Sequence, residues 1–263
     1  MKAASPFKRL AGLAGLMLLA VLALQLYFVG RIALMMVVNP ESTAFERSEM
    51  YRIAATKSSL KWRQQWVPYP RISDKLKTAV IASEDASFIE HDGVDLEALE
   101  KAWDKNSKAE QKAQLANEKA ERNGSRTVAG KPATLAAVKA PKIIGGSTIT
   151  QQLAKNLFLS SERTLPRKGQ ELVLALLLEA LLSKERILEI YLNNVEWGEG
   201  VFGAEAASQH YYRKSAANLS AYEAARLAVM LPRPRYFETR PNSGYLSSRA
   251  STIVARMGGV EVP

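Results

Sequence analysis

Two adjacent carboxylates follow an apolar segment in the first half of the chain. Glu84 and Asp85 come directly after residues 73–82, whose apolar side chains have the spacing of one helical face. A carboxylate at the end of an apolar helix loses part of its hydration, which raises its pKa toward the range that suits a general base. The alternative is that both are ordinary surface acids at a helix end, and this fragment alone does not separate the two interpretations.

A glycine pair, Gly145 and Gly146, opens a second polar cluster. The spacing predicts a helix over 147–158, with Ser147 or Thr148 as its N-terminal cap. Free backbone N–H groups and hydroxyls then converge where an anion could bind. The same hydroxyl residues could equally serve only as capping and packing groups.

A third cluster places two cations and an acid on one helical face. Glu171 follows Arg167 by four residues and Lys168 by three, so the three side chains are neighbours on a helix. As a surface ion-pair group, the cluster would contribute only ~0.3–0.5 kcal/mol per pair. As a functional site, it could bind pyrophosphate, with Glu171 as a second carboxylate able to share a divalent ion.

A fourth cluster, in residues 184–193, carries Glu189 and Asn193 one helical turn apart. Their side chains therefore lie on the same face of the expected helix. We interpret this pair as organising the helix end and the Trp197–Gly198 loop, and not as reacting groups.

Helical patterns dominate the elements that would position these clusters. Residues 172–182 are apolar except for Glu179, and such a stretch is too short to cross a bilayer, so we expect a core helix there. Convincing runs of alternating strand pattern are not found, and the predicted fold class is mainly α. The helices are expected over residues 73–82, 147–158, 167–193, 204–212 and 221–231.

Composition limits the kinds of site and partner. The 263-residue chain is 47% hydrophobic, which is enough for one sizeable core and an appendage. It has no cysteine, which excludes disulfides and thiolate-bound zinc, and its only histidines, His91 and His210, disfavour a histidine-rich metal site. The net charge of +10 indicates an acidic partner: nucleic acid, an anionic membrane surface or a phosphorylated substrate.

The N-terminal segment decides among these partners. Residues 10–29 are uncharged, and a helix of about 20 residues is about 30 Å long, the thickness of a bilayer's hydrocarbon core. Three cations precede this run, so we expect residues 1–9 in the cytoplasm and the rest of the chain outside, which removes nucleic acid as a partner. A cleaved signal peptide is the alternative. We favour a membrane anchor and exit over residues 10–38, because the apolar stretch resumes at 32–38 without a clear cleavage site.

A juxtamembrane segment, residues 39–72, follows the anchor and precedes the predicted catalytic domain over 73–263. It holds Trp62, Trp66 and Tyr69 among prolines. Aromatic residues near a membrane exit can lie at the headgroup level. Packing between the anchor and the domain is the other interpretation, and both stay open.

Residues 101–142 differ from the rest of the domain in composition. They contain ten Lys or Arg against four acids and few large apolar side chains. Such a segment buries too little surface to offset its ordering entropy, so we expect a mobile basic insertion with nascent helix around 109–122. It would be a solvated surface insertion, or it would attract anionic lipid or glycan.

Taken in this order, the four clusters resemble the glycosyltransferase domain of class A penicillin-binding proteins and of monofunctional biosynthetic peptidoglycan transglycosylases. The resemblance covers about residues 70–258, and no transpeptidase signature follows, which favours the monofunctional type. It implies a lysozyme-like helical head with a smaller membrane-touching jaw. The residues that carry it are Glu84, Asp85, Phe88, His91 and Gly93 in the first motif, Gly146 to Gln152 with Lys155 and Asn156 in the second, Arg167, Lys168 and Glu171 in the third, and Ile187 to Glu189 with Tyr191 to Asn193 in the fourth.

The resemblance implies a reaction and a role for each residue. The family joins C1 of a lipid-linked MurNAc to the 4-hydroxyl of GlcNAc in lipid II, with inversion, and releases undecaprenyl pyrophosphate. By resemblance, Glu84 is the base, and Glu171 assists the cations that stabilise the leaving group. No tightly bound cofactor is implied, and Mg²⁺ or Mn²⁺ would stimulate the reaction, with Glu171 as the candidate ligand. The implied substrate-binding residues are Ser147, Thr148, Gln151, Gln152, Lys155, Asn156, Arg163, Arg167 and Lys168, with Arg256 as a phosphate contact or a packing residue, and the implied supporting residues are Asp85, Phe88, His91, Gly93, Glu189, Tyr191 and Asn193.

The implied partners are lipid II, the growing lipid-linked strand, the membrane and other proteins of cell-wall synthesis or division. The implied location is the inner membrane, with one span and an extracytoplasmic catalytic domain. A lytic transglycosylase is the nearest rival, but it needs a general acid and no cationic pyrophosphate site. A non-catalytic scaffold is another rival, and the intact Glu84 and Glu171 argue against it.

Overall fold

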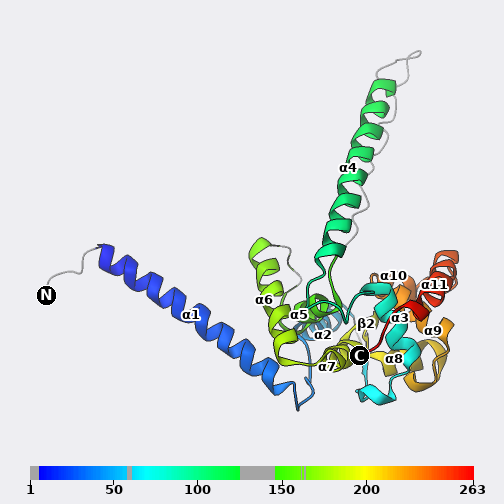
Figure 1. Cartoon of the computed structure of the whole chain (residues 1–263), viewed down its shortest axis with the longest axis horizontal. Coiled ribbons are helices and arrows are strands. Elements are labelled where there is room, and N and C mark those ends of the chain that lie inside the picture. Colours follow the sequence, from blue (N-terminus) through cyan, green and yellow to red (C-terminus); the bar gives the residue numbers. More distant parts are fainter. Residues whose placement is uncertain (1–5, 58–60, 125–145, 161, 163) are drawn as a thin grey trace. The chain divides into compact units, whose positions relative to one another are not determined.

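The computed structural model describes residues 6–57, 61–124, 146–160, 162 and 164–263, and most of them are helical (Figure 1). The chain divides into two units, residues 1–94 with 148–263 and residues 95–147. The elements in chain order are α1 (Pro6–Leu34), α2 (Ala44–Thr56), β1 (Arg63–Gln64), η1 (Tyr69–Arg71), α3 (Asp74–Glu84), α4 (Leu96–Gly124), α5 (Ile149–Phe158), α6 (Leu165–Leu181), α7 (Lys184–Asn194), β2 (Glu196–Gly198), β3 (Val201–Phe202), α8 (Ala204–Tyr212), η2 (Ala216–Asn218), α9 (Ala221–Met230), α10 (Pro234–Glu238), α11 (Gly244–Arg256) and η3 (Met257–Gly259).

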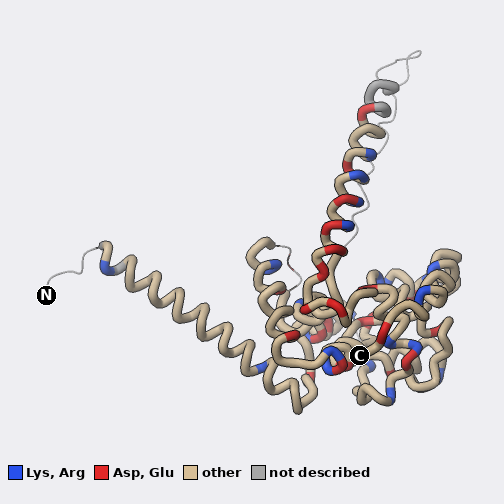
Figure 2. Tube along the Cα trace, in the orientation of Figure 1, with Lys and Arg blue, Asp and Glu red and all other residues tan. Residues whose placement is uncertain are grey.

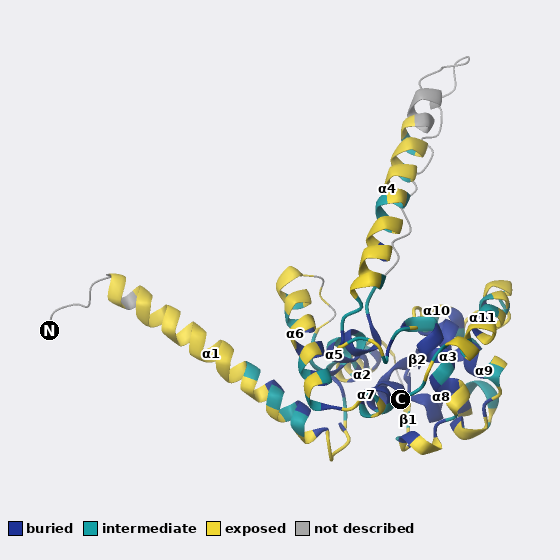
Figure 3. Cartoon of the chain, in the orientation of Figure 1, coloured by how far each residue is buried: buried dark blue, intermediate teal, exposed yellow. Residues whose placement is uncertain are grey.

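The first helix, α1, is long and apolar enough over Leu10–Leu34 to cross a membrane. Most of its side chains are exposed, and burial begins only toward its C-terminal end (Figure 3). There the ring of Phe28 packs against Phe158 of α5 with centroids 5.3 Å apart, and Ile32 and Met35 join the hydrophobic core. The C-terminal end of α1 is therefore part of the folded unit.

The core of the larger unit forms where α9 packs against α3 and α11. α3 buries Leu76 and Val80 on one face, as its apolar spacing predicts. α9 meets its neighbours with small side chains, including the fully buried Ala224 and Ala228. Small side chains at a helix contact shorten the distance between the axes, which holds α3 firmly along its length.

A small sheet joins the segment after α2 to the chain after α7. Its strand order is β1-β3-β2, with β1 parallel and β2 antiparallel to β3. Trp62, next to β1, stacks on Phe202 of β3 with ring centroids 4.5 Å apart, and Tyr69 is buried. Trp62 and Tyr69 thus pack within the folded unit, and the choice between the headgroup level and packing between the anchor and the domain stays open.

The helix boundaries follow the expected ranges closely, with one break that the apolar pattern did not predict. The range 167–193, expected as one helix, is divided into α6 and α7 at Leu182 and Ser183. Leu182 is extended, and the Ser183 side chain accepts a hydrogen bond from the backbone N–H of Arg186. Serine favours this N-cap arrangement over a place inside a helix, which explains the break.

The juxtamembrane segment contains a helix, α2, that the sequence interpretation missed. Thr43 and Glu46 form a capping box at its start, in which each side chain accepts from the backbone N–H of the other residue. The Thr-x-x-Glu spacing was a usable signal for a helix start.

The expectation of a loop from residue 101 is wrong as far as Gly124, because α4 runs from Leu96 to Gly124. Residues 125–142 of the expected insertion lie outside the described residues. Alanine, glutamate, lysine and glutamine dominate α4 and are strong helix formers. The ion pair between Glu97 and Lys101, four residues apart, is also of the kind that supports an exposed helix. The nascent helix expected around 109–122 lies within α4, so the prediction placed helix there but made it too short.

Candidate active site

Glu84 is the last residue of α3 and is held by two neighbouring side chains. Gln152 of α5 donates from Nε2 to its Oε2 over 3.1 Å, and the Ser83 hydroxyl lies 3.5 Å from Oε1. Burial raises the pKa of Glu84, the hydrogen bonds from Gln152 and Ser83 lower it, and the charge of Asp85 raises it further. The net direction is upward. A carboxylate with a raised pKa is a stronger base toward a hydroxyl proton.

Tyr191 of α7 continues this contact on the other side of Gln152. Its hydroxyl donates to Gln152 Oε1 over 3.0 Å, which fixes the amide with Nε2 toward Glu84. Burial, together with the charges of Glu84 and Asp85, raises the pKa of the Tyr191 phenol well above its ordinary value. The phenol therefore stays protonated and remains a donor. One hydrogen-bonded chain thus joins residues of the first, second and fourth motifs.

Asp85, the C-cap of α3, points away from this chain and organises the loop that follows. Its Oδ2 accepts from the backbone N–H of Ile149, the first residue of α5, over 2.9 Å. Its Oδ1 lies 2.8 Å from Nε2 of His91, and the Gly93 N–H donates to Nδ1 of the same ring over 3.1 Å. A carboxylate at a helix N-terminus is electrostatically favourable. These contacts connect the loop to α5, and the supporting role of Asp85 stays a prediction.

Gly93 ends this loop in a conformation that other residues rarely adopt. Its φ is +85°, and a Cβ there would lie 3.0 Å from Cγ of Glu179 and 3.3 Å from the carbonyl oxygen of Ala175, both on α6. The Thr148 hydroxyl donates to the Gly93 carbonyl over 2.7 Å. Thr148 is also the N-cap of α5, so the predicted capping residue ties the loop to the helix that carries Gln152.

Lys184 and Glu179 are part of this arrangement, although the sequence interpretation gave them no role. Lys184 Nζ donates to the His91 carbonyl over 2.5 Å and to Glu179 Oε1 over 2.8 Å. It also lies 4.6 Å from the ring centroid of the fully buried Phe88. The position of Glu179 as the single acid in an apolar run was the available signal.

The third motif forms a compact ion-pair cluster near the start of α6. Glu171 is only 3% exposed, and its two oxygens pair with Arg167 (2.9 Å) and with Lys168. Arg167 Nε is the one buried side-chain nitrogen or oxygen of the described residues that has no hydrogen-bond partner. A buried donor without a partner is costly, and an anionic ligand would satisfy it. Within the described part of the chain, no hydrogen bond or ion pair joins this cluster to Glu84.

The surroundings of Glu171 do not suit a metal ion. Both carboxylate oxygens already face cations, and the described residues contain no group of three or more His, Cys, Asp or Glu that could hold a metal. Divalent ions prefer several oxygen ligands. We therefore derive no step through a metal at this position.

The side chains of the fourth motif form hydrogen bonds with a different segment from the one expected. Asn193 exchanges two hydrogen bonds with the backbone of Val67, and Glu189 Oε1 accepts from the N–H of Tyr69. These contacts hold the segment before α3, and not the Trp197–Gly198 loop. The expectation for that loop is corrected here, because the two side chains point to the chain that crosses α7.

The other predicted substrate-binding residues are spread over three places. Ser147 lies in the unit 95–147 and is half-buried, while Gln151 is buried and Lys155 and Asn156 are half-buried on α5. Arg163 lies outside the described residues. Arg256 is exposed in the last turn of α11.

Arg249, two helical turns before Arg256 on α11, was not predicted. Its charge lowers the pKa of Glu84, and α11 packs against α3. A spacing of seven residues puts Arg249 and Arg256 near the same face of the helix. This repeat in the C-terminal helix was the signal available in the sequence.

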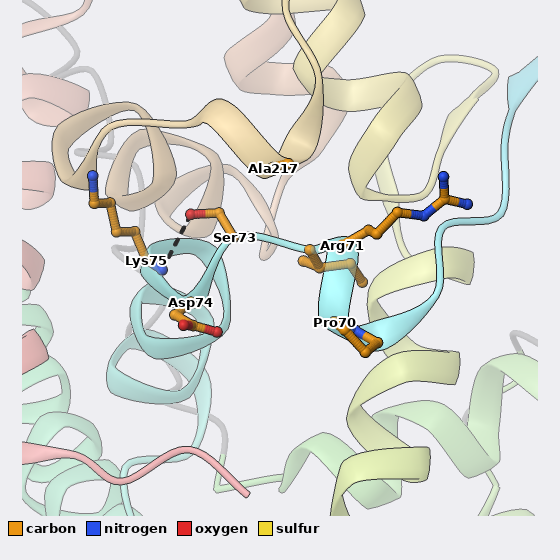
Figure 4. Close-up of a pocket in the computed structure, with 7 residues that line it drawn as sticks. Pro70, Arg71, Ser73, Asp74, Lys75 and Ala217 are labelled. Carbon is orange, nitrogen blue, oxygen red and sulfur yellow. Dashed lines mark hydrogen bonds between the residues drawn. The ribbon is translucent and has the colours of Figure 1, made fainter.

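A pocket of ≈ 300 Å³ lies at the other end of α3, lined by residues 70–75 and Ala217 (Figure 4). In it the Ser73 hydroxyl accepts from the N–H of Lys75 over 3.3 Å. α3 begins here and ends at Glu84, so about 15 Å of helix separates the two places. The pocket contains none of the predicted site residues, and we place the candidate active site at the C-terminal end of α3.

The fold and the site together define a helical enzyme-like unit with one membrane-crossing candidate helix and a desolvated carboxylate. Comparison with known proteins gives the class. The sequence model of the transglycosylase family matches residues 51–116 and 122–258. The chain therefore belongs to the transglycosylase family, whose domain polymerises glycan strands in cell-wall synthesis. The match passes through most of the 101–142 segment.

Individual relatives agree with the family match. The biosynthetic peptidoglycan transglycosylase of Burkholderia thailandensis is 49% identical over 242 residues, which cover 92% of this chain and 83% of the relative. That of Bordetella pertussis is 52% identical over 225 residues, covering 86% and 82%. That of Herminiimonas arsenicoxydans is 48% identical over 246 residues, covering 94% of both.

Proposed function

We propose that this chain is a membrane-anchored peptidoglycan glycosyltransferase that polymerises lipid II into β-1,4-linked glycan strands, with Glu84 as its general base. The observation that carries the residue assignment is the environment of Glu84, which is desolvated and yet oriented by Gln152. Desolvation raises the basicity of the carboxylate, and the hydrogen bond holds it in one position. Both properties serve proton abstraction from a hydroxyl.

In the proposed reaction, Glu84 takes the proton from the 4-hydroxyl of the acceptor GlcNAc. The resulting oxygen nucleophile attacks C1 of the donor MurNAc from the face opposite the pyrophosphate. A bond forms between this oxygen and C1, the bond from C1 to the pyrophosphate oxygen breaks, and that oxygen leaves with the electron pair. One displacement of this kind inverts the configuration at C1. Glu84 then loses its proton to solvent.

The leaving group needs charge stabilisation more than it needs an acid, because pyrophosphate is a weak base. Arg167 and Lys168 would supply it, together with Lys155 and Arg163. Glu171 would keep the two cations of α6 in place, as its ion pairs with them suggest. The unpaired Nε of Arg167 supports an anionic ligand at this cluster. Stimulation by Mg²⁺ or Mn²⁺ stays a prediction on which no step of this mechanism depends.

The anchor and its orientation are part of the proposal. A single N-terminal span with residues 1–9 in the cytoplasm would put the catalytic unit on the outer face of the cytoplasmic membrane. The contacts of the α1 end with α5 and α6 support an anchor that is retained, since they belong to the folded unit. Partners from cell-wall synthesis or division stay a prediction.

The experiment that tests this proposal compares two substrates. The purified full chain is incubated with lipid II and, separately, with purified cell wall. Glycan strands from lipid II, with no soluble fragments from cell wall, are the expected result. Fragments from cell wall and no strands would indicate a lytic transglycosylase, and no reaction with either would favour the scaffold.

A further inference from the structure

A pocket of ≈ 340 Å³ lies where α1 ends and the chain turns toward α2. Arg31, Leu34 and Val38 line one part of it, and Glu41 and Arg47 line another. It therefore combines two cations, one acid and apolar side chains. A pocket of this size with a few placed polar groups is typical of a ligand site.

In the described part of the chain, both arginines of the pocket have only neutral hydrogen-bond partners. Arg31 donates to the Tyr27 hydroxyl over 3.2 Å and lies 5.9 Å from the centroid of that ring. Arg47 donates to the carbonyl and the hydroxyl of Ser42, each over 3.0 Å. Among the described residues, neither guanidinium forms an ion pair. Two positive charges are thus available to an anion.

The acid next to Arg47 in sequence, Glu46, forms no ion pair with it among the described residues. Glu46 is buried, and its carboxylate accepts from the Thr43 N–H over 2.7 Å and from Gln64 Nε2 over 2.8 Å. Burial raises the pKa of Glu46 to about 7, and the hydrogen bonds and the charge of Arg47 oppose this only in part. Glu41 is then the single acid that lines the pocket.

The position of the pocket relative to a membrane follows from α1. The uncharged run of α1 ends just before Arg31, and Figure 2 shows this helix almost free of charged residues between its two ends. If the run fills the hydrocarbon core, Arg31 and Tyr27 lie at the headgroup level, where arginine and tyrosine side chains are favoured. Headgroup phosphates lie at the same level.

The pocket also offers apolar contacts and a fixed backbone. Leu34 is 52% exposed and Val38 48% exposed, so both offer apolar surface beside the arginines. The backbone between them is fixed, because Arg186 of α7 donates to the carbonyls of Met35 (2.8 Å) and Val38 (3.2 Å). A fixed frame lowers the entropy cost of binding.

We propose that this pocket binds the headgroup phosphate of an anionic phospholipid, with Arg31 and Arg47 on the phosphate and an acyl chain along Leu34 and Val38. The two guanidiniums can form charge-assisted hydrogen bonds with a phosphate, and the apolar side chains can pack against an acyl chain. The site does not involve the residues assigned to glycosyl transfer. The test of this lipid site is therefore independent of the test of the proposed function.

The test measures lipid retention by the full chain and not its activity. The protein is purified in a neutral detergent and given phosphatidylglycerol or phosphatidylcholine, and bound lipids are counted by native mass spectrometry. We expect phosphatidylglycerol to be retained at least about tenfold more strongly, which corresponds to ~1.4 kcal/mol. The double variant Arg31→Gln with Arg47→Gln should retain both lipids equally. Glu41→Gln should retain more phosphatidylglycerol than the wild type.

Arg240→Gln is the matched control, because Arg240, like Arg31, lies over a tyrosine ring, that of Tyr236, with 4.2 Å to the ring centroid, and, like Arg47, is exposed. It should leave lipid retention unchanged. Inorganic phosphate alone is a separate arm, read as displacement of bound phosphatidylglycerol, and should displace little. Full displacement by phosphate would show an anion site without lipid selectivity. An undiminished preference in the double variant, or an equal loss in Arg240→Gln, would overturn the proposal.

Discussion

Gln152 donates from Nε2 to Oε2 of Glu84 over 3.1 Å, and its position depends on Tyr191 on the opposite side. This contact joins the end of α3 to the middle of α5. It lowers the pKa of a carboxylate that burial raises. The pKa of Glu84 is thus raised by burial, with the hydrogen bond from Gln152 opposing this rise.

Replacing Glu84 with Gln should abolish polymerisation of lipid II while the protein stays folded and membrane-bound. The amide keeps the size of the side chain and cannot accept the hydroxyl proton. Strand formation from lipid II measures the loss. Retention of more than about a tenth of wild-type activity, a loss below ~1.4 kcal/mol, would refute the base assignment. Glu90→Gln, an exposed acid of the same loop, is the control and should keep full activity.

The same variant should also be at least as stable as the wild type at pH 8. The pKa of Glu84 is raised on folding above its ordinary value of 4.5. Its contribution to stability is therefore fully present below 4.5 and is lost as the pH rises through the folded value. Thermal unfolding at pH 5 and pH 8 would measure this, and a clear loss of stability at pH 8 would contradict the raised pKa of Glu84.

Removing the donor to Glu84 should move the acid limb of the pH–rate profile. In Gln152→Met the hydrogen bond that lowers the pKa of Glu84 is gone, so that pKa rises further and the limb shifts to higher pH. Tyr191→Phe keeps Gln152 and should shift the limb less. kcat/KM for lipid II across the pH range is the measurement, and a limb that stays in place in both variants would exclude Glu84 as its source.

Neutralising the α6 and α5 cations should weaken the use of the lipid-linked donor. Arg167→Gln and Lys155→Gln are each expected to lower kcat/KM roughly tenfold to a hundredfold, about 1.4–2.7 kcal/mol, in the range of charge-assisted hydrogen bonds. Rates at limiting lipid II test this. Lys105→Gln, an exposed lysine of α4, is the control. Unchanged turnover in both site variants would place the pyrophosphate site elsewhere.

Two glycines should respond in opposite ways to alanine. Gly93→Ala combines a φ of +85° with a close approach to α6, and we expect a loss of about 1–3 kcal/mol in unfolding free energy. Gly169→Ala, in α6, meets nothing within 4 Å and should stabilise by about 0.5–1 kcal/mol. Denaturant unfolding of both variants measures the two changes in unfolding free energy. Equal effects of the two substitutions would contradict the structure of the loop.

The two glutamines that join the anchor to α6 should be energetically coupled. Gln25 and Gln170 donate to each other's amide oxygens over 3.0 and 3.2 Å. A double-mutant cycle with Gln25→Leu and Gln170→Leu should give a coupling of about 0.5–2 kcal/mol, as for polar contacts between membrane helices. Thermal unfolding in detergent is the readout. Additive effects would show that the anchor docks without this contact.

Several parts of the fold were open to prediction because local chemistry fixes them. The apolar spacing around Leu76 and Val80 predicted α3, and the hydroxyl pair Ser147 and Thr148 predicted the start of α5, of which the structure uses Thr148. The capping box at Thr43 and Glu46 carried equal information and was missed. α4 was predicted only as nascent helix around 109–122 within a mobile insertion, because the expected lack of burial outweighed helix propensity.

Contacts between distant segments were beyond prediction, because spacing along the chain does not reveal which side chains meet. The seven-residue repeat set Arg249 and Arg256 on one helical face, but it did not place Arg249 near Glu84. The sequence also did not place Lys184 on the carbonyl of His91. The sequence also did not show where the side chains of Glu189 and Asn193 point. The expectation for the Trp197–Gly198 loop failed for that reason.

The sequence by itself determined the helical class, the membrane-crossing candidate and the four ordered motifs, since each depends on residues that are close along the chain. Only the tertiary structure decided that Glu84 is desolvated and held by Gln152, that Asp85 turns to α5, and that Arg167 keeps an unpaired buried Nε. A pKa depends on the groups packed around a carboxylate, and packing joins helices that lie far apart in sequence.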